Sequence, residues 1–211
     1  MHILYEDNHL IAVHKKCGQS VQPEEGKPTS LEDEVKQYIK VSKNKPGDVF
    51  LGVIHRLDMP VQGIVLFAKT SKALVRMNEA FKHRDVSKIY TAEVISVPTE
   101  HKAMLTHYLV RDDVKRLTKA YDKVMPNSQQ AQLEYELIST KGKHAVLKIT
   151  LHTGRKHQIR AQLAKKGFPI VGDVKYGAAA PLPNRGIALC ATHLSFAHPI
   201  SKEMIVIETS F

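Results

Sequence analysis

The sequence predicts an α+β fold, a mixed, largely antiparallel sheet with flanking helices. Short apolar runs typical of strands recur along the chain, and only a few segments have helical spacing. Strands and helices follow one another in irregular order, which favours an α+β arrangement. Nothing marks a strong boundary, a repeat or a low-complexity tract within the 211 residues. We therefore expect a single domain over residues 1–211.

The first part of the chain predicts strands around one helix. An apolar strand is expected at residues 8–14, followed by a turn. Ser30 can cap a helix that runs to about Val41, because its hydroxyl can accept a backbone N–H and acidic residues follow it. Residues 49–54 and 63–69 are predicted strands on either side of a charged bend.

The later part of the chain is richer in strands. Ser71 is expected to cap a second helix, in which Leu74, Met77 and Phe81 recur at helical spacing and form a core stripe. The remaining predicted elements are a strand at 87–97, a hairpin of 132–139 with 144–151, a helix at 156–167, and strands at 188–196 and 203–208.

Residues 111–123 contain five cations, Arg111, Lys115, Arg116, Lys119 and Lys123. The segment lacks clean periodicity. It suits a mobile basic loop, and it equally suits a solvated surface segment.

Composition points to a polyanionic partner. The chain has 31 Lys and Arg against 21 Asp and Glu, a net charge of +10 and a pI near 9.5. Such a balance favours nucleic acid, although a merely basic protein would show it too. Aromatic residues are 6% with no tryptophan, so a broad base-stacking platform is not indicated. No CxxC pair, long apolar run or signal-peptide core occurs, and we expect a cytoplasmic monomer.

The most informative stretch is His55-Arg56-Leu57-Asp58, which lies between two apolar runs and is punctuated by Pro60. A carboxylate beside a histidine and an arginine on rigid flanks suits a nucleophile, because the cation favours its charged form. An ordinary surface turn with an ion pair would give the same four residues. Both interpretations stay open on this stretch alone.

A second polar cluster runs from Thr153 to Arg160 and opens a predicted helix. Backbone N–H groups at a helix start, with Thr153 and Arg155, suit a phosphate. Lys156 and Arg160 are four residues apart and share a face, so one cation could meet phosphate and another a buried carboxylate. A solvent-facing basic helix start is the alternative interpretation.

Several other chemistries lack their motifs. The chain contains no G-x-G-x-x-G, no G-x-x-x-x-G-K-[ST], no H-E-x-x-H and no G-x-S-x-G. Its twelve histidines show no metal-ligand spacing. The sequence therefore gives no support for a nucleotide-binding loop, a zinc site or a serine hydrolase.

Taken together, six motifs resemble the RluA-type pseudouridine synthases along nearly the whole chain. They are, in family order, Ile3 through Gly18, His55-Arg56-Leu57-Asp58 with Gly63 through Lys69, Lys88-Ile89-Tyr90, Thr153 through Arg160, Pro169 through Gly177, and His193 through Pro199. The chain departs from the family pattern at Lys16, at Val61-Gln62 and at Ala161-Gln162.

The resemblance implies a fold, a reaction and a partner. It implies a mixed-sheet catalytic fold that binds RNA across a central cleft and converts uridine to pseudouridine, with no cofactor and no metal. The target would be rRNA or tRNA. The catalytic opening begins at Met1, so we expect the family's S4-like RNA-binding domain to be missing.

The resemblance also implies roles for single residues. Asp58 would be the nucleophile, Arg160 would pair with it, and Tyr90 would stack on the flipped base and assist removal of the C5 proton. Arg56 would fill the space left by the flipped nucleotide or hold a phosphate, and His55 would shape the bend. For RNA binding we expect His55, Arg56, Arg155 and Lys156.

Two rival interpretations remain. A catalytically silent RNA-binding or assembly module could keep the same fold, although binding alone does not need a carboxylate near a polyanion. The other rival is a nucleotide hydrolase, but the sequence contains neither a phosphate-binding loop nor a metal-ligand motif to support it.

Overall fold

The computed structural model describes residues 1–26, 28–44 and 46–211. The chain forms two compact units. Unit 1 comprises Met1–Val86 and Ala191–Phe211, and unit 2 comprises Ser87–Cys190. The expectation of one domain over residues 1–211 remains a prediction, and each unit is described here by itself.

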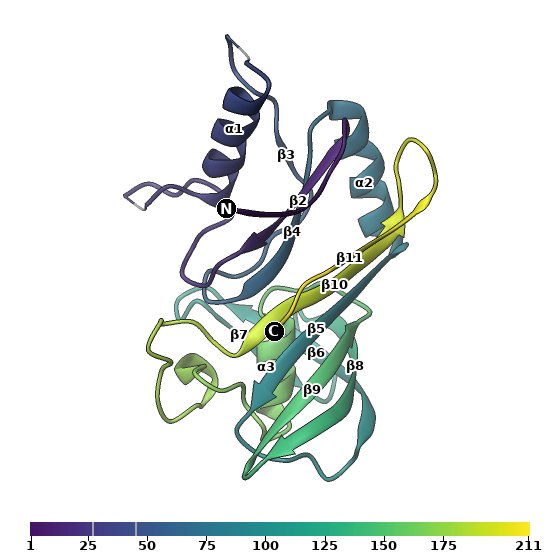
Figure 1. The fold of residues 1–211 in the computed structure, drawn as a ribbon. Coiled ribbons are helices and arrows are strands. Elements are labelled where there is room, and N and C mark those ends of the chain that lie inside the picture. The colour runs from purple at the N-terminus through teal and green to yellow at the C-terminus, as the bar shows by residue number, and fades with distance from the viewer. Residues whose placement is uncertain (27, 45) are drawn as a thin grey trace. The chain divides into compact units, whose positions relative to one another are not determined.

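Unit 1 is built on strands that follow one another in the order β1-β2-β4-β10-β11, with β3 also on β4. Four of these pairings have defined registers and are antiparallel: β1 with β2, β2 with β4, β3 with β4 and β10 with β11. The strand bounds are β1 (His2–Glu6), β2 (Leu10–Lys15), β3 (Gly52–Val53), β4 (Gln62–Ala68), β10 (Leu189–Ala197) and β11 (Met204–Glu208). Its helices are α1 (Leu31–Ser42) and α2 (Ser71–His83), shown in Figure 1.

The core of unit 1 lies where α2 packs on the sheet. Met77 of α2, Leu66 of β4 and Phe196 of β10 belong to one cluster of buried side chains. Leu74 and Phe81, the other members of the predicted helical stripe, are partly buried against the same cluster. Burial of this apolar surface is the main force that holds the helix on the sheet.

Helix starts in unit 1 follow side-chain capping. Ser30 caps α1 as predicted, and Ser30 and Asp33 form a reciprocal capping box. The prediction of Ser71 as the cap of α2 is wrong by one residue. Thr70 has the extended backbone of a cap, and its Oγ1 accepts the N–H of Ala73 at 3.3 Å.

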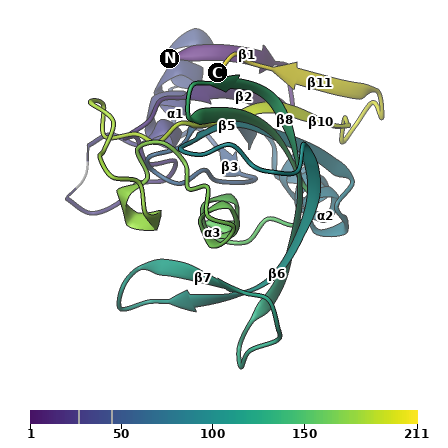
Figure 2. The same cartoon turned by 90° about the horizontal axis from the view of Figure 1, so that it is seen from below.

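Unit 2 has strands in the order β5-β9-β8-β6-β7, and all four of these pairings are antiparallel. The elements are β5 (Val86–Val94), β6 (Lys102–Asp112), β7 (Leu117–Tyr121), β8 (Gln129–Lys141), β9 (His144–Leu151), α3 (Gln158–Lys165) and a 3-10 turn, η1 (Val174–Tyr176). Helix α3 packs beside β6 and β7, as Figure 2 shows. Ala161 of α3 meets Leu109 of β6 and Ala131 of β8 in a small buried cluster.

The structure corrects several predicted bounds. Residues 111–121 are the end of β6, a turn and β7, so all but the last two residues of the segment 111–123 form a paired hairpin and not a loop. Strand β6 itself was not predicted. The strand expected at 49–54 shrinks to β3, and the helix expected from 156 begins at Gln158. The hairpin of β8 and β9 is confirmed.

Within the described residues, every helix is too short or too polar to serve as a membrane span.

Candidate active site

The bend that carries Asp58 lies between β3 and β4 in unit 1. The carbonyl of Asp58 accepts the N–H of Val61 at 3.0 Å, and the carbonyl of Met59 accepts the N–H of Gly18 at 2.8 Å. Leu57 is buried beneath the bend, while Asp58 is half-buried and Met59 is exposed. These contacts fix the backbone on both sides of the Asp58 carboxylate.

A buried lysine, Lys15, holds this bend from the interior of unit 1. Lys15 has no exposed surface, and its Nζ donates to the carbonyls of Lys16 at 3.0 Å, Gln19 at 2.8 Å and Met59 at 3.1 Å. Burial lowers the pKa of Lys15 to about 8, and electrostatic attraction to Cys17 and Asp58 opposes that shift. The bend therefore has an ammonium group within electrostatic range of the candidate nucleophile.

The sequence predicted no role for Lys15 and placed it in the turn that follows the strand. The structure makes it the last residue of β2 and buries it completely. The available signal was its position at the end of an uninterrupted apolar run, Leu10–Val13, which predicts a strand buried on both faces.

His55 is directed into unit 1. Its Nε2 accepts the N–H of Leu66 at 3.1 Å, and its ring stacks on Phe81 with centroids 5.2 Å apart. A ring nitrogen that accepts a hydrogen bond carries no proton, so this contact favours the neutral ring. Arg56 points the other way. It is exposed, and its Nη1 donates to Gln22 Oε1 at 3.2 Å.

Gly63, next to the bend, allows β4 to run close to β10. Its φ is +115°, and a Cβ there would lie 2.4 Å from the carbonyl oxygen of Ala191. Only glycine fits a backbone that has both this torsion and this approach. The glycine that follows the charged motif therefore positions the strand that leaves the bend.

In unit 2, Tyr90 lies on β5 opposite Ile149 of β9 and is half-buried. Lys88 precedes it by two residues and so shares its face of the strand. A Cβ at Gly154 would lie 3.8 Å from Lys88 Nζ, which places that ammonium beside the turn before α3. The K-x-Y element and the T-G-R element thus meet within this unit.

Arg160 is held by a buried carboxylate. Its Nε donates to Asp173 Oδ2 at 2.7 Å and its Nη2 to Asp173 Oδ1 at 2.8 Å, and the two side chains are 6% and 1% exposed. The Cζ of Arg160 also lies 4.9 Å from the centroid of the Tyr176 ring. A bidentate pair of this kind fixes the plane of the guanidinium.

The turn that leads into α3 is braced by internal hydrogen bonds. Thr153 Oγ1 donates to Gln158 Oε1 at 2.8 Å and accepts the N–H of Gln132 at 2.9 Å. The N–H of Arg155 also donates to Gln158 Oε1, at 3.0 Å. Thr153 and this N–H therefore serve the turn, whereas the side chains of Arg155 and Lys156 lie on the exposed surface.

Tyr176 contacts the start of α3 and the strand β7 beside it. Its hydroxyl accepts the N–H of Thr118 at 2.8 Å and lies 2.8 Å from His157 Nδ1. Burial raises the pKa of Tyr176. His157 takes a left-handed backbone with φ of 53°, so this contact helps hold an unusual torsion at the helix start.

The predicted site residues are divided between the two units. His55, Arg56 and Asp58 share the bend of unit 1, and Tyr90, Arg155, Lys156 and Arg160 belong to unit 2. Among the described residues there is no group of three or more His, Cys, Asp and Glu side chains suited to a metal ion.

Comparison with known proteins identifies the family. Residues 9–165 match the RNA pseudouridylate synthase family model. The chain is 30% identical to an uncharacterized RNA pseudouridine synthase of Bacillus subtilis, covering 99% of this chain and 68% of that protein. It is 33% identical to ribosomal large subunit pseudouridine synthase D of Xanthomonas campestris, covering 97% of this chain and 64% of that protein. The chain thus spans about two thirds of the length of these relatives.

Solved structures agree on the fold. Human RNA pseudouridylate synthase domain containing 4 superposes with a TM-score of 0.82 at 22% identity, covering 100% of this chain and 88% of that one. Human RNA pseudouridylate synthase domain containing 1 superposes with a TM-score of 0.79 at 20% identity, covering 100% of this chain and 83% of that one. These likenesses confirm the predicted α+β fold. The chain therefore belongs to the RNA pseudouridylate synthase family and is of the RluA type.

Proposed function

We propose that this RNA pseudouridine synthase isomerises uridine in structured RNA with Asp58 as its nucleophile. The observation that carries the proposal is the anchoring of the bend. Lys15 Nζ and the N–H of Gly18 both bind the carbonyl of Met59, the residue after Asp58. A nucleophile must be held in a fixed geometry to gain from proximity, and this arrangement supplies one.

The reaction is an internal exchange of bonds. The bond from C1′ to N1 breaks, a bond from C1′ to C5 forms, C5 loses a proton and N1 gains one. Attack of Asp58 at C1′, attack at C6 and assistance of a glycal route all use the same carboxylate. The target base must first leave its stack, which costs a few kcal/mol and is easiest in a loop.

We assign the unit 2 residues to support of this carboxylate and of the base. Arg160 would pair with Asp58, and a guanidinium can bind two carboxylates at once because it has five N–H donors. Asp173 would then act as the second carboxylate that fixes the plane of Arg160. Tyr90 would stack on the flipped base and assist loss of the C5 proton.

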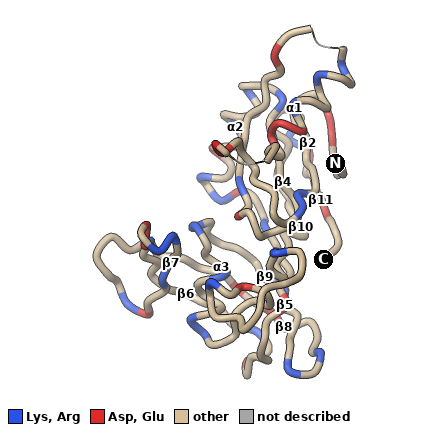
Figure 3. Tube along the Cα trace, turned by 90° about the vertical axis from the view of Figure 1, so that its left-hand side faces the viewer, with Lys and Arg blue, Asp and Glu red and all other residues tan. Residues whose placement is uncertain are grey.

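The RNA strand would be bound by exposed cations. Arg56, Arg155 and Lys156 have exposed side chains, and Lys and Arg residues also recur along the hairpin of β6 and β7 (Figure 3). Acidic neighbours moderate the charge of that hairpin, since Arg111 pairs with Asp113 and Lys119 with Asp112. We assign His55 mainly to the shape of the bend, because its ring contacts are internal.

The experiment that tests the nucleophile is Asp58→Asn, with the exposed Asp48→Asn as the matched control. Release of tritium from RNA labelled at C5 of uridine measures isomerisation, and filter binding measures affinity. We expect no tritium release from the Asp58 variant, with RNA affinity within a few-fold of wild type and a fully active control. Isomerisation by the Asp58 variant at the wild-type rate would remove this residue from the nucleophile role.

The RNA class is part of the proposal. Relatives named ribosomal large subunit pseudouridine synthase D make ribosomal RNA the first substrate to test, with tRNA second. Carbodiimide-based maps of RNA from a deletion strain and its parent would identify the uridine. If the wild-type chain binds RNA and leaves every map unchanged, the non-catalytic RNA-binding module becomes the better account.

A further inference from the structure

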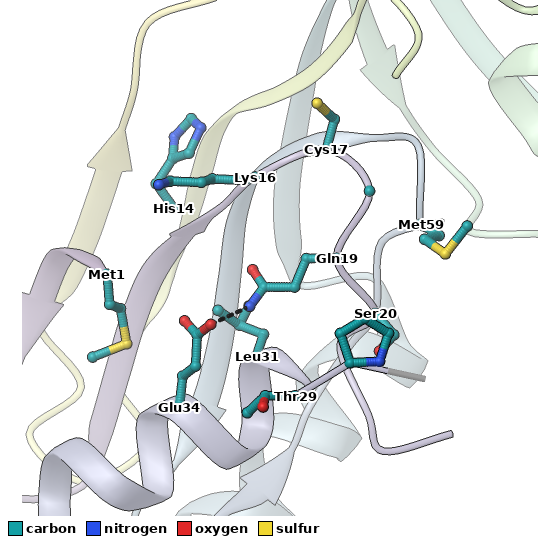
Figure 4. A pocket seen from close by; sticks show the side chains of 12 residues that line it. Met1, His14, Lys16, Cys17, Gln19, Ser20, Thr29, Leu31, Glu34 and Met59 are labelled. Atoms are coloured by element: carbon teal, nitrogen blue, oxygen red, sulfur yellow. Dashed lines mark hydrogen bonds between the residues drawn. The ribbon is translucent and has the colours of Figure 1, made fainter. Parts of the chain in front are cut away.

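A pocket of about 420 Å³ opens beside the bend of Asp58, entirely within unit 1. Its wall includes Lys16, Gln19, Glu34 and Met59, and Figure 4 shows these side chains around it. The volume lies in the range of pockets that bind small molecules. Met59 follows Asp58 in the chain, so the pocket borders the bend that carries the candidate nucleophile.

The pocket and the bend are anchored to the same nitrogen. Lys15 Nζ binds the carbonyls of Lys16 and Gln19, which belong to the pocket wall, and the carbonyl of Met59, which belongs to the bend. A group bound in the pocket is therefore held at a fixed position relative to the bend that carries Asp58. This arrangement suits two neighbouring nucleotides of one RNA strand.

The wall carries the Glu34 carboxylate together with Lys16, His14 and Met1, and this mixture suits a base with both donors and acceptors better than a phosphate, which has acceptors alone. Glu34 contributes a carboxylate, which would repel a phosphate, and Gln19 Nε2 fixes that carboxylate by donating to its Oε1 at 2.8 Å. Lys16 adds an ammonium group on an exposed side chain. Unstacked bases in RNA are commonly read through hydrogen bonds to such edge-facing groups.

Among the four bases, guanine matches this donor set best. Its Watson–Crick edge presents two N–H donors that a carboxylate accepts, and its O6 and N7 are the usual acceptors for lysine. Adenine would turn its N1 acceptor toward the carboxylate. Cytosine offers a single donor position, and uracil places carbonyl oxygens on both sides of its N–H.

We propose that this pocket binds a guanine base next to the target uridine in the RNA substrate, with Glu34 and Lys16 as the specificity-determining residues. The inference rests on the proposed function, because it assumes that the target uridine is bound at Asp58. It adds a second base contact and a sequence preference to that function.

A binding measurement tests the pocket without any catalytic step. Guanosine, adenosine, cytidine and uridine 5′-monophosphates are titrated separately into the full chain, and backbone amide shifts are followed by NMR. We expect the guanosine nucleotide to shift amides of residues 16–20 and 29–34 and to bind at least several-fold more tightly than the other three. Equal binding of all four, or shifts elsewhere, would overturn the proposal.

A kinetic measurement tests its use in catalysis. Once the target uridine is mapped, hairpin RNAs are made with each of the four bases at either flanking position, and kcat/KM is measured for wild type, Glu34→Gln, Lys16→Met and Lys40→Met. Lys40 lies exposed near the end of α1 and is absent from the pocket wall, so its variant controls for the loss of one positive charge.

We expect wild type and the Lys40 variant to prefer a flanking guanine by roughly 5- to 100-fold, the range for one well-placed base contact. The Glu34 and Lys16 variants should lose most of that preference while they still modify the non-guanine hairpins. An unchanged preference in both variants would overturn the pocket assignment. Wild-type chain that modifies no RNA would instead contradict the proposed function, and the nucleotide titration would still decide whether the pocket binds guanine.

Discussion

Replacement of Asp173 by Asn removes the carboxylate that compensates a buried guanidinium. Arg160 donates two hydrogen bonds to Asp173, at 2.7 and 2.8 Å, and the Asp173 side chain is only 1% exposed. Asparagine has nearly the same shape, so little packing is lost. The variant therefore isolates the charge and one acceptor of the pair.

The expected cost follows from desolvation. Removing one partner of a buried ion pair typically costs about 3–5 kcal/mol, because the charge that remains buried has lost its bidentate partner. For a chain of this length, each kcal/mol lowers the melting temperature by about 2–4 °C. We therefore expect Asp173→Asn to melt roughly 6–20 °C below wild type.

Circular dichroism melts at neutral pH provide the measurement, with two comparison variants. Glu134→Gln breaks the pair between the half-buried Glu134 and the exposed Lys102, 3.1 Å apart, and should cost less than about 1 kcal/mol. Arg160→Met combined with Asp173→Leu removes both charges and should recover much of the loss, because no buried charge remains. If Asp173→Asn melted with wild type, the pair would contribute nothing and the reasoning from burial would be refuted.

Three further predictions concern the cap, the buried lysine and the partner. Thr70→Ala should cost about 1 kcal/mol in chemical unfolding and Ser71→Ala much less, because Thr70 Oγ1 is the cap of α2; equal losses would contradict this. The pKa of Lys15 lies near 8, below its unfolded value, so the unfolded state binds more protons between that pH and the unfolded pKa. The Lys15 contribution to stability therefore rises with pH across this window, while kcat/KM should fall above pH 8 as its charge is lost. Lys15→Met should lack that fall, and an identical pH profile would refute the link. RNA affinity should fall steeply with salt because phosphate contacts release counterions, and a flat dependence would count against RNA.

The sequence could locate most elements because their apolar spacing is strong, and it failed where polar residues interrupt that spacing. Strand β6 buries Leu105, His107 and Leu109 on alternate positions, and a histidine in the middle conceals the period of two. Strand β7 exposes Lys119, yet the neighbouring Thr118 is buried, and its Oγ1 is satisfied there by donating to the carbonyl of Lys156 at 3.0 Å. Tertiary hydrogen bonds of this kind leave no local periodicity to read.

Site residues differ in the same way. The motif that contains Asp58 is visible in the sequence because charge is placed between two apolar runs. The partner of Arg160 within unit 2 was not visible, since Asp173 follows 13 residues later, beyond the end of α3. An ion pair between residues on either side of such a turn depends on the path of the backbone, and residue propensities for helix or strand do not determine that path. The assignment of Arg160 to Asp58 came from resemblance and remains a proposal.

Burial of the Lys15 ammonium costs desolvation free energy, yet the surrounding carbonyls explain why a lysine suits this position. The loop of residues 16–20 and the bend at Met59 are irregular, so their carbonyls lack the partners that a helix or sheet would give. One ammonium with three donors binds three such acceptors at once, whereas an apolar residue would remove a hydrogen bond from each of them and leave Met59 with the N–H of Gly18. The same three bonds couple the pocket wall to the residue after Asp58. A change at Lys15 should therefore alter base preference and turnover together, whereas changes at Glu34 should alter base preference with little effect on turnover of RNAs that lack the flanking guanine.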